Sequence, residues 1–277
     1  MEQYITDSKQ INLSSNSATT SNGSKNSVMM FNLNNILKKE QDIIYNLVSV
    51  VHAEIPVSFY TINSTNNIIV IKIGVGVNTS YTLTNGNYNA TSFKTMLLSI
   101  LPIGFTLLLN ISTGIYTIGY TTLFYIMSSS TCYKLMGFVK NTTYTSNISN
   151  NIIMPFCVSF MGINRLKIKS NIIQTNNLDS YSRGKSNMLC SIPVSSAPGG
   201  LIIYNNISQF KSIFPNNNLD YIDISISDEL DQEIDFNGVD IYITLQIDSI
   251  RKHIPEINNL QHLLSNTDIP MEESELI

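Results

Sequence analysis

The chain carries three histidines, the side chains best suited to bind a metal or to act as a general base near neutral pH. His52 precedes Glu54 by two residues, so the two side chains share one face of a predicted strand. His253 and His262 lie in the predicted C-terminal tail, and we do not expect the three histidines to converge with a fourth ligand around a metal. The spacing therefore favours a surface contact between His52 and Glu54 over a cupin-type metal centre.

A second group of chemically capable side chains is the acidic segment 228–238, in which Asp231, Glu233 and Asp235 alternate with other residues. Alternating carboxylates are typical of calcium-binding loops. However, Gly238 falls two residues late for an EF-hand loop, and no glutamate closes the segment. We expect solvated turn charges here, and the sequence leaves open whether the segment binds calcium.

The other catalytic signatures are missing from the sequence. It has no Gly-x-Ser-x-Gly elbow, no glycine-rich phosphate loop and no cysteine spaced for pairing with a histidine. Cys132, Cys157 and Cys190 lie far apart without a CxxC motif. Their odd number and the polar N-terminus predict reduced thiols inside a cell. We therefore predict no catalytic residue, no cofactor, no metal site and no enzyme activity.

The composition also limits the partners that the chain can bind. Its 277 residues carry a net charge of −4, with 43% hydrophobic and only 13% charged residues. Segment 165–169 (RLKIK) is the nearest approach to a basic run, but its cations alternate with apolar residues, as on the solvent face of a strand. Segment 96–127 is the most apolar, yet proline, glycine and polar residues interrupt it. We therefore expect neither direct nucleic-acid binding nor a membrane span.

The strongest structural pattern lies at residues 219–248. Isoleucines alternate with polar residues over 220–227, and isoleucine and leucine do the same over 240–248. This period of two is typical of strands with one buried face. With the acidic segment and its Asn-Gly turn between them, the two arms are interpreted as a long antiparallel hairpin. A second sheet must cover its apolar face.

One helix is predicted after Asn89, a good N-cap residue, and it should end at Pro102. Its apolar residues follow helical spacing: Phe93, Met96, Leu97, Ile100 and Leu101.

Elsewhere the chain reads as roughly eight to ten short strands separated by turn signals. This pattern predicts an all-β, antiparallel jelly-roll β-sandwich with one short helix and flexible terminal arms, although an immunoglobulin-like sandwich has a similar strand count. The expected organisation is a largely flexible N-terminal arm at 1–40, a jelly-roll domain at 41–248 and a C-terminal tail at 249–277. Removal of residues 1–27 is expected to spare the fold of the subunit and to weaken assembly.

The order of several short motifs resembles one protein family. The motifs are Ile55-Pro-Val-Ser-Phe-Tyr-Thr-Ile-Asn63, Asn66-Asn67, Tyr81-Thr-Leu-Thr-Asn-Gly-Asn-Tyr88, Leu135-Met-Gly-Phe138, Leu189-Cys-Ser-Ile-Pro-Val194, Asp228-Glu229 and Ile234-Asp-Phe-Asn-Gly238. Over roughly 48–248 this series resembles the penton, or minor capsid, proteins of virophages, polinton-like viruses and related double-stranded DNA viruses. The Asn-Gly-Asn-Tyr88 stretch departs from the usual Pro/Glu-Gly-Asn-Tyr type of turn.

The resemblance implies a jelly-roll subunit that forms homopentamers at icosahedral vertices and touches the major capsid protein. Such a subunit would be assembled inside the host cell and would reside in the capsid of the virion. The resemblance supplies no catalytic residues. The alternative from the residues alone is a β-sandwich module that binds a receptor or a glycan, although the chain has no tryptophan, the commonest residue for stacking on sugars.

Overall fold

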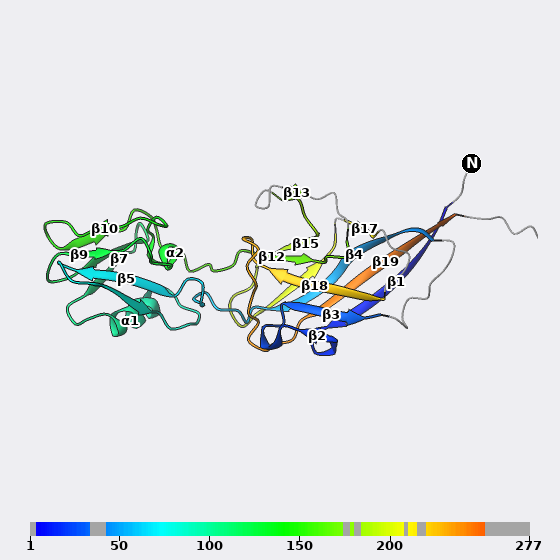
Figure 1. The fold of residues 1–277 in the computed structure, drawn as a ribbon, viewed down its shortest axis with the longest axis horizontal. Helices are drawn as coiled ribbons and strands as arrows, with labels where there is room; N and C mark the ends of the chain where they lie inside the picture. The colour runs from blue at the N-terminus through cyan, green and yellow to red at the C-terminus, as the bar shows by residue number, and fades with distance from the viewer. Residues whose placement is uncertain are drawn as a thin grey trace, which may run out of the picture.

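The computed structural model describes residues 4–33, 43–173, 178–179, 184–207, 210–214 and 220–252. Throughout these ranges the strands pair antiparallel, and only two helices accompany them. The prediction of an all-β antiparallel protein is confirmed. Neither described helix is long and apolar enough to cross a membrane. The described strands and helix α1 divide between two lobes, which Figure 1 shows end to end along the long axis of the molecule.

The first lobe is a sandwich of two sheets, which we call the jelly-roll lobe. One sheet has the order β1-β19-β4-β16, with β17 also paired to β4. Its strands are β1 (Tyr4–Ser14), β19 (Tyr242–Lys252), β4 (Ile43–Pro56), β16 (Leu201–Asn205) and β17 (Ser212–Phe214). The other sheet has the order β15-β12-β18-β3-β2. Its strands are β15 (Met188–Pro193), β12 (Arg165–Lys169), β18 (Tyr221–Ser227), β3 (Val28–Asn32) and β2 (Thr20–Ser21).

The strands of this lobe pair in a nested order, as in one long hairpin folded over on itself. Early strand β1 pairs with the late strand β19, and inside that pair β3 pairs with β18. Further inward, β4 pairs with β16, and β12 pairs with β15. A long hairpin folded over in this way is a jelly roll. A small extra ribbon, β13 (Leu178–Asp179) with β14 (Gly184–Lys185), follows β12 in the chain.

The predicted hairpin at 219–248 is wrong, although both of its arms are strands. Strand β18 lies between β12 and β3, whereas β19 lies between β1 and β4 in the opposite sheet. Ile224 on β18 and Leu245 on β19 are fully buried in the same core. Alternation identifies the buried face of a strand, and both sheets bury that face against one core, so the pattern cannot select the pairing partner.

The expected flexible arm also differs from the structure. Strand β1 pairs with β19 along all of its 11 residues, and it buries Ile11 and Leu13 in the core. The Ser8 hydroxyl donates to Asp248 Oδ1 at 2.6 Å, and the Ser15 hydroxyl donates to Asp240 Oδ1 at 2.7 Å. The N-terminal segment is therefore an edge strand of the sandwich. At the other end, β19 extends to Lys252, and the rest of the predicted tail lies outside the described residues.

The second lobe, which we call the inserted lobe, spans residues 61–162 between β4 and β12. It contains a four-stranded sheet of order β10-β9-β5-β6 and a three-stranded sheet of order β11-β8-β7. Its strands are β5 (Ile68–Ile73), β6 (Asn78–Thr82), β7 (Thr106–Asn110), β8 (Ile115–Gly119), β9 (Phe124–Ile126), β10 (Tyr144–Thr145) and β11 (Asn151–Ile153). Its buried residues form a hydrophobic cluster separate from that of the jelly roll. The expected single domain at 41–248 thus contains two cores.

The chain enters and leaves the inserted lobe at one place. A methyl group placed on Gly162 would lie 3.5 Å from the Cα of Thr61, so the entering and leaving segments lie side by side. Asn87 holds the entering segment, because its Oδ1 accepts from both the backbone N–H and the hydroxyl of Thr61.

Helix α1 (Ala90–Ile100) covers the core of the inserted lobe and confirms the predicted helix. Asn89 and Ser92 form a reciprocal capping box, and Phe93 and Leu97 are fully buried. A second helix, α2 (Tyr133–Met136), is a single turn that ends at Gly137 in the left-handed conformation, with φ at 79°. Glycine is required there twice over, because a Cβ would also collide with the carbonyl oxygen of Phe156.

Candidate functional site

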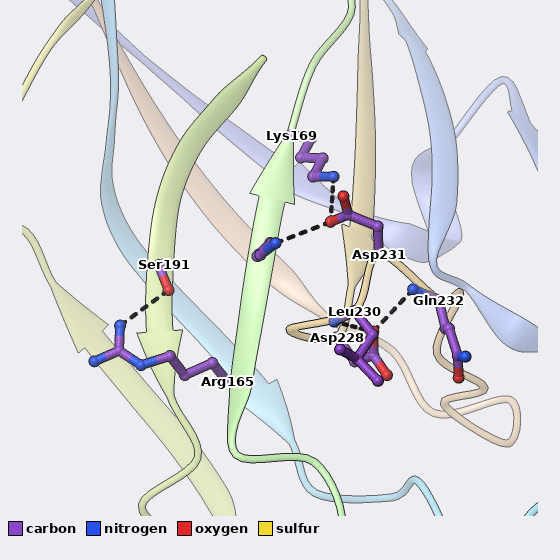
Figure 2. A network of polar contacts seen from close by, with 8 residues as sticks. Arg165, Lys169, Ser191, Asp228, Leu230, Asp231 and Gln232 are labelled. Atoms are coloured by element: carbon purple, nitrogen blue, oxygen red, sulfur yellow. Dashed lines mark hydrogen bonds and ion pairs between the residues drawn. The ribbon is translucent and has the colours of Figure 1, made fainter. Parts of the chain in front are cut away.

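The acidic segment 228–238 lies between β18 and β19 and is folded against the jelly-roll lobe. Asp228 Oδ1 accepts hydrogen bonds from the backbone N–H groups of Leu230 and Gln232, both at 2.8 Å (Figure 2). Further along, Ile234 and Phe236 are buried in the jelly-roll core. The segment is therefore anchored to the fold by its apolar residues, while Asp231, Glu233 and Asp235 are exposed to solvent, as the sequence predicts.

The predicted Asn-Gly turn is confirmed at the end of this segment. Asn237 and Gly238 both have positive φ values, 52° and 76°. The Asn237 side chain donates to the carbonyl oxygen of Ser58 at 2.6 Å, and the Ser58 hydroxyl donates to the carbonyl oxygen of Phe236 at 2.7 Å. These contacts tie the acidic segment to the chain just before the inserted lobe.

Asp231 links the acidic segment to strand β12. It accepts from Lys167 Nζ at 3.1 Å and from Lys169 Nζ at 2.6 Å, as Figure 2 shows for the labelled Lys169. The Lys167 side chain is only 10% exposed. The sequence interpretation of 165–169 as a plain solvent face is therefore wrong at Lys167, because the acidic segment covers this strand and neutralises its charge. Only Arg165 fits that interpretation. It is exposed, and its Nη1 donates to the Ser191 hydroxyl at 3.2 Å.

The two aspartates at the start of the segment have opposite electrostatic environments. Burial raises the pKa of Asp231, but hydrogen bonds from Lys169 and Lys167 outweigh burial and leave the pKa lowered. Burial raises the pKa of Asp228, and the two backbone N–H donors compensate only in part. Asp231 is thus held ionised by its partners, whereas ionised Asp228 is disfavoured by its surroundings.

The remaining carboxylates of the segment point to separate partners. Glu229 accepts from the backbone and the side-chain amide of Asn164, both at 3.3 Å. Glu233 pairs with Lys25 Nζ at 3.0 Å, and Asp235 accepts from the backbone N–H of Asn237 at 2.8 Å. Across the residues that the structure describes, no three histidine, cysteine or acidic side chains come together in a way that could hold a metal ion.

The acidic segment forms one wall of a cleft of about 700 Å³ between the two lobes. The inserted lobe supplies the opposite wall, residues 128–135 with Lys140, and the connecting residues 59–66 form part of the lining. Helix α2 lies at the end of the inserted lobe that faces the jelly roll (Figure 1). The lining thus contains the acidic segment, with Lys25 paired to Glu233, and Lys134 and Lys140 from the inserted lobe. Sequence reasoning missed this cleft, because it did not separate the two lobes.

The cleft lining includes one thiol, that of Cys132, which is 1% exposed. Burial raises its pKa to about 12, so the thiol stays protonated at neutral pH and is a poor nucleophile. Nearby, Lys140 Nζ lies 5.8 Å from the centre of the Tyr133 ring, a cation–π distance. The cleft is therefore suited to polar recognition.

His52 and Glu54 lie on β4 in the jelly-roll lobe and contact each other as the sequence suggests. His52 Nε2 is 3.2 Å from Glu54 Oε1, and Nδ1 is 2.8 Å from Asn205 Oδ1. The hydrogen bonds with Asn205 and Glu54 raise the pKa of His52, because two oxygen acceptors favour the doubly protonated ring. His253 and His262 lie outside the described residues.

Fold and site together define a jelly-roll protein with a second lobe inserted between β4 and β12. No known family model matches the chain, and no curated protein matches it either. Among solved structures, the chain is similar to a selenomethionine-labelled mavirus penton protein. The two are 12% identical, the match covers 89% of this chain and 99% of that chain, and the TM-score is 0.44.

Proposed function

We propose that the chain is a penton subunit, a minor capsid protein that forms homopentamers at the icosahedral vertices of a double-stranded DNA virus or virophage. In this role the subunit contacts itself and the surrounding major capsid protein, and it is assembled inside the host cell into the virion. The proposal assigns it no catalytic activity and no direct contact with nucleic acid. The order of sequence motifs over 48–248 supports it, and one feature of the jelly-roll surface carries it.

That feature is a pair of exposed apolar patches on the outer faces of the two sheets. On the first sheet, Ile203 and Tyr242 both pair with Glu54 of β4, so they lie in one row across three strands, on either side of the Glu54 carboxylate that contacts His52. Both are exposed, and so is Leu201 at the start of β16. We call these three residues the first patch.

The second patch lies on the other sheet and consists of Val28, Met30 and Tyr221. Val28 and Met30 alternate with buried Met29 and Phe31 along β3, so they point away from the core. Tyr221 lies on the neighbouring strand β18 and is exposed as well. The sandwich therefore presents two different apolar patches on its two opposite outer faces.

Two unlike patches on one subunit are what a closed ring requires. In a cyclic assembly with more than two subunits, each copy contacts its neighbours through two different surfaces, one on each side. Large apolar side chains exposed on strands are also the residues that such contacts bury. Under this proposal, one patch of each jelly-roll lobe contacts the other patch of the next copy in the ring.

The test is negative-stain electron microscopy of the purified chain with substitutions in each patch. Wild-type protein should form five-fold rings, and Ile203→Lys and Met30→Lys should each abolish them while thermal unfolding stays unchanged. Ile153→Lys, at an exposed aliphatic residue of the inserted lobe, is the matched control and should leave rings intact. A wild-type chain that remains monomeric at high concentration, without rings, would contradict the proposal.

A receptor- or glycan-binding module is the second candidate, and the cleft between the lobes is the observation that favours it. Its volume of about 700 Å³ falls within the range of ligand pockets, and tyrosine, asparagine and charged side chains line it. A glycan-array signal from monomeric protein that is lost in a Lys140→Ala variant would support this alternative over the capsid role.

A further inference from the structure

Four turns lie together at the end of the inserted lobe toward which β5 points, away from the jelly roll (Figure 1). We call them the apex: residues 74–77, 102–105, 120–123 and 146–150. The backbone N–H of Gly74 donates to the Leu123 carbonyl at 2.8 Å, and that of Tyr120 donates to the Asn150 carbonyl at 3.1 Å. The Phe105 and Tyr120 rings stack at 4.2 Å. These contacts hold the four turns in one rigid cluster.

Each turn of the apex exposes an aliphatic side chain to solvent. Val75, Ile103 and Ile148 have exposed fractions of 103%, 101% and 104%, so they project fully from three separate turns. Val77 and Leu123 are also exposed. None of the four turns contains a charged residue: their sequences are GVGV, PIGF, YTTL and SNISN. Folding does not account for such side chains, because they bury nothing in the core.

The arrangement is poorly suited to a protein partner. A stable complex buries about 20–30 residues on each side, and the apex offers five exposed aliphatic residues on four turns. The full exposure of Val75, Ile103 and Ile148 also shows that these three do not pack against one another into a groove or a continuous face. Isolated projecting side chains are instead suited to a fluid apolar phase, which closes around each of them separately.

The rim of the apex has the composition of a membrane interface. Lys72 and Tyr125 pair across β5 and β9, next to the apical ends of these strands, with Lys72 Nζ 5.7 Å from the centre of the Tyr125 ring. Tyr120 adds a second half-buried ring at the apex itself. Tyrosine and lysine prefer the headgroup level of a bilayer, directly beside an apolar segment that enters it.

We propose that the apex is a peripheral membrane-contact surface that inserts Val75, Ile103 and Ile148 into the headgroup–acyl boundary of a phospholipid bilayer. Insertion of turn tips requires no membrane-spanning element. The proposal does not depend on the capsid role, because it concerns a different lobe and different residues from the two jelly-roll patches.

The first test is flotation of the full chain with phosphatidylcholine vesicles. Wild-type protein should float with the vesicles, and the triple variant Val75→Ser, Ile103→Ser, Ile148→Ser should lower the bound fraction at least about tenfold. The control is Ile111→Ser with Ile207→Ser, two residues that are each 92% exposed and lie outside the apex. This control should stay within about twofold of wild type. Wild-type protein that does not float, or a control that loses as much binding as the triple variant, would overturn the proposal.

The second test uses the complete absence of tryptophan from the chain. A single tryptophan in an Ile148→Trp variant should shift its emission to shorter wavelength on addition of the same vesicles and should be quenched by brominated lipid. An Ile111→Trp variant should show neither effect. Equal responses at the two positions would refute apical insertion. Apical insertion would also be refuted if wild-type protein formed oligomers in sedimentation without vesicles and the triple serine variant did not. The apex would then bind a second copy of the chain.

Discussion

The two lobes build their hydrophobic cores from different structural elements. The jelly-roll lobe uses long strands, with β4 at 14 residues and β19 at 11, whose aliphatic side chains alternate into one core. The inserted lobe uses strands of six residues or fewer, and a helix and stacked rings complete its core. Phe93 packs against Tyr116 and Phe160, and Phe105 packs against Tyr120 and Phe124.

The difference also extends to how far apart in the sequence the contacts lie. In the jelly roll, the first described strand pairs with the last, so the lobe is complete only when residues 4–14 and 242–252 are both in place. The inserted lobe is contained within 61–162 and closes through local hairpins such as β7–β8. Because loop closure favours local contacts, we expect the inserted lobe to fold first and to unfold separately. Amide hydrogen exchange resolved by lobe measures this directly.

The strongest way to separate the lobes is to place a charge in one core. Leu245 is fully buried on β19, so Leu245→Asp puts an unpaired carboxylate between the sheets. We expect a loss of at least ~3–5 kcal/mol, comparable to the whole stability of a small domain, and loss of exchange protection throughout the jelly-roll lobe. Protection in the inserted lobe should persist. Simultaneous loss in both lobes would show that they form one cooperative unit.

The N-terminal strand gives the next largest effect. In β1, Ile11 and Leu13 are buried while Gln10 and Asn12 are exposed. Replacing both buried residues with alanine should cost about 2 kcal/mol or more each in the free energy of unfolding of the jelly-roll lobe. Replacing both exposed residues should change it by less than about 0.5 kcal/mol. Denaturant unfolding compares the two double variants. An equally small loss of stability in both would mean that β1 is dispensable for the fold.

The inserted lobe has its own matching test. Phe93 is a residue of α1 whose side chain is fully buried in the core of this lobe. Phe93→Ala should therefore destabilise the lobe by about 3–5 kcal/mol and leave exchange protection in β1 and β19 unchanged. Lys94→Ala, on the same helix but outside the core, is the control. Loss of protection in β19 of the Phe93 variant would contradict the separation of the two cores.

The smallest effect concerns the acidic segment and depends on pH. Because the pKa of Asp231 is lowered in the folded protein, its carboxylate stabilises the fold above the ordinary aspartate value of 3.8, and this contribution is lost as the pH falls below it. Asp231 is partly exposed, so solvent screens its ion pairs, and Asp231→Asn should cost about 0.5–1 kcal/mol at pH 7 and less near pH 2. The measurement is the free energy of unfolding of the jelly-roll lobe across this range.

Asp228→Asn provides the contrast for this prediction. The pKa of Asp228 is raised, so its charge is unfavourable at pH 7, and an asparagine keeps an oxygen for the N–H groups of Leu230 and Gln232. Stability at pH 7 should stay within about 0.5 kcal/mol of wild type. Equal losses in both variants would mean that the ion pairs with Lys167 and Lys169 contribute nothing specific.

The sequence was sufficient where a local rule determines the structure. Asn89 and Pro102 bound the helix, alternation marks Ile224 and Leu245 as buried, and Asn237-Gly238 marks a turn. These features depend on neighbouring residues alone. The all-β class follows from them because each strand and turn signal is read independently.

The features that sequence reasoning missed all depend on distant residues. Strand β1 has only Ile11 and Leu13 on its buried face, and its polar composition resembles that of a free arm until β19 is placed beside it. The boundary between the lobes depends on which strands pair with which, so no local sequence signal marks it. The burial of Lys167 depends on Asp231, a residue far along the chain that only the folded sandwich brings close.

The close approach of Thr61 and Gly162 has a consequence for how this molecule can change over evolution or by engineering. A module whose two ends lie side by side can be excised and the cut closed with a short bridge, or exchanged for another of different size, while the scaffold keeps its shape. We therefore expect the jelly roll to tolerate replacement of the segment between β4 and β12 by a segment of different length.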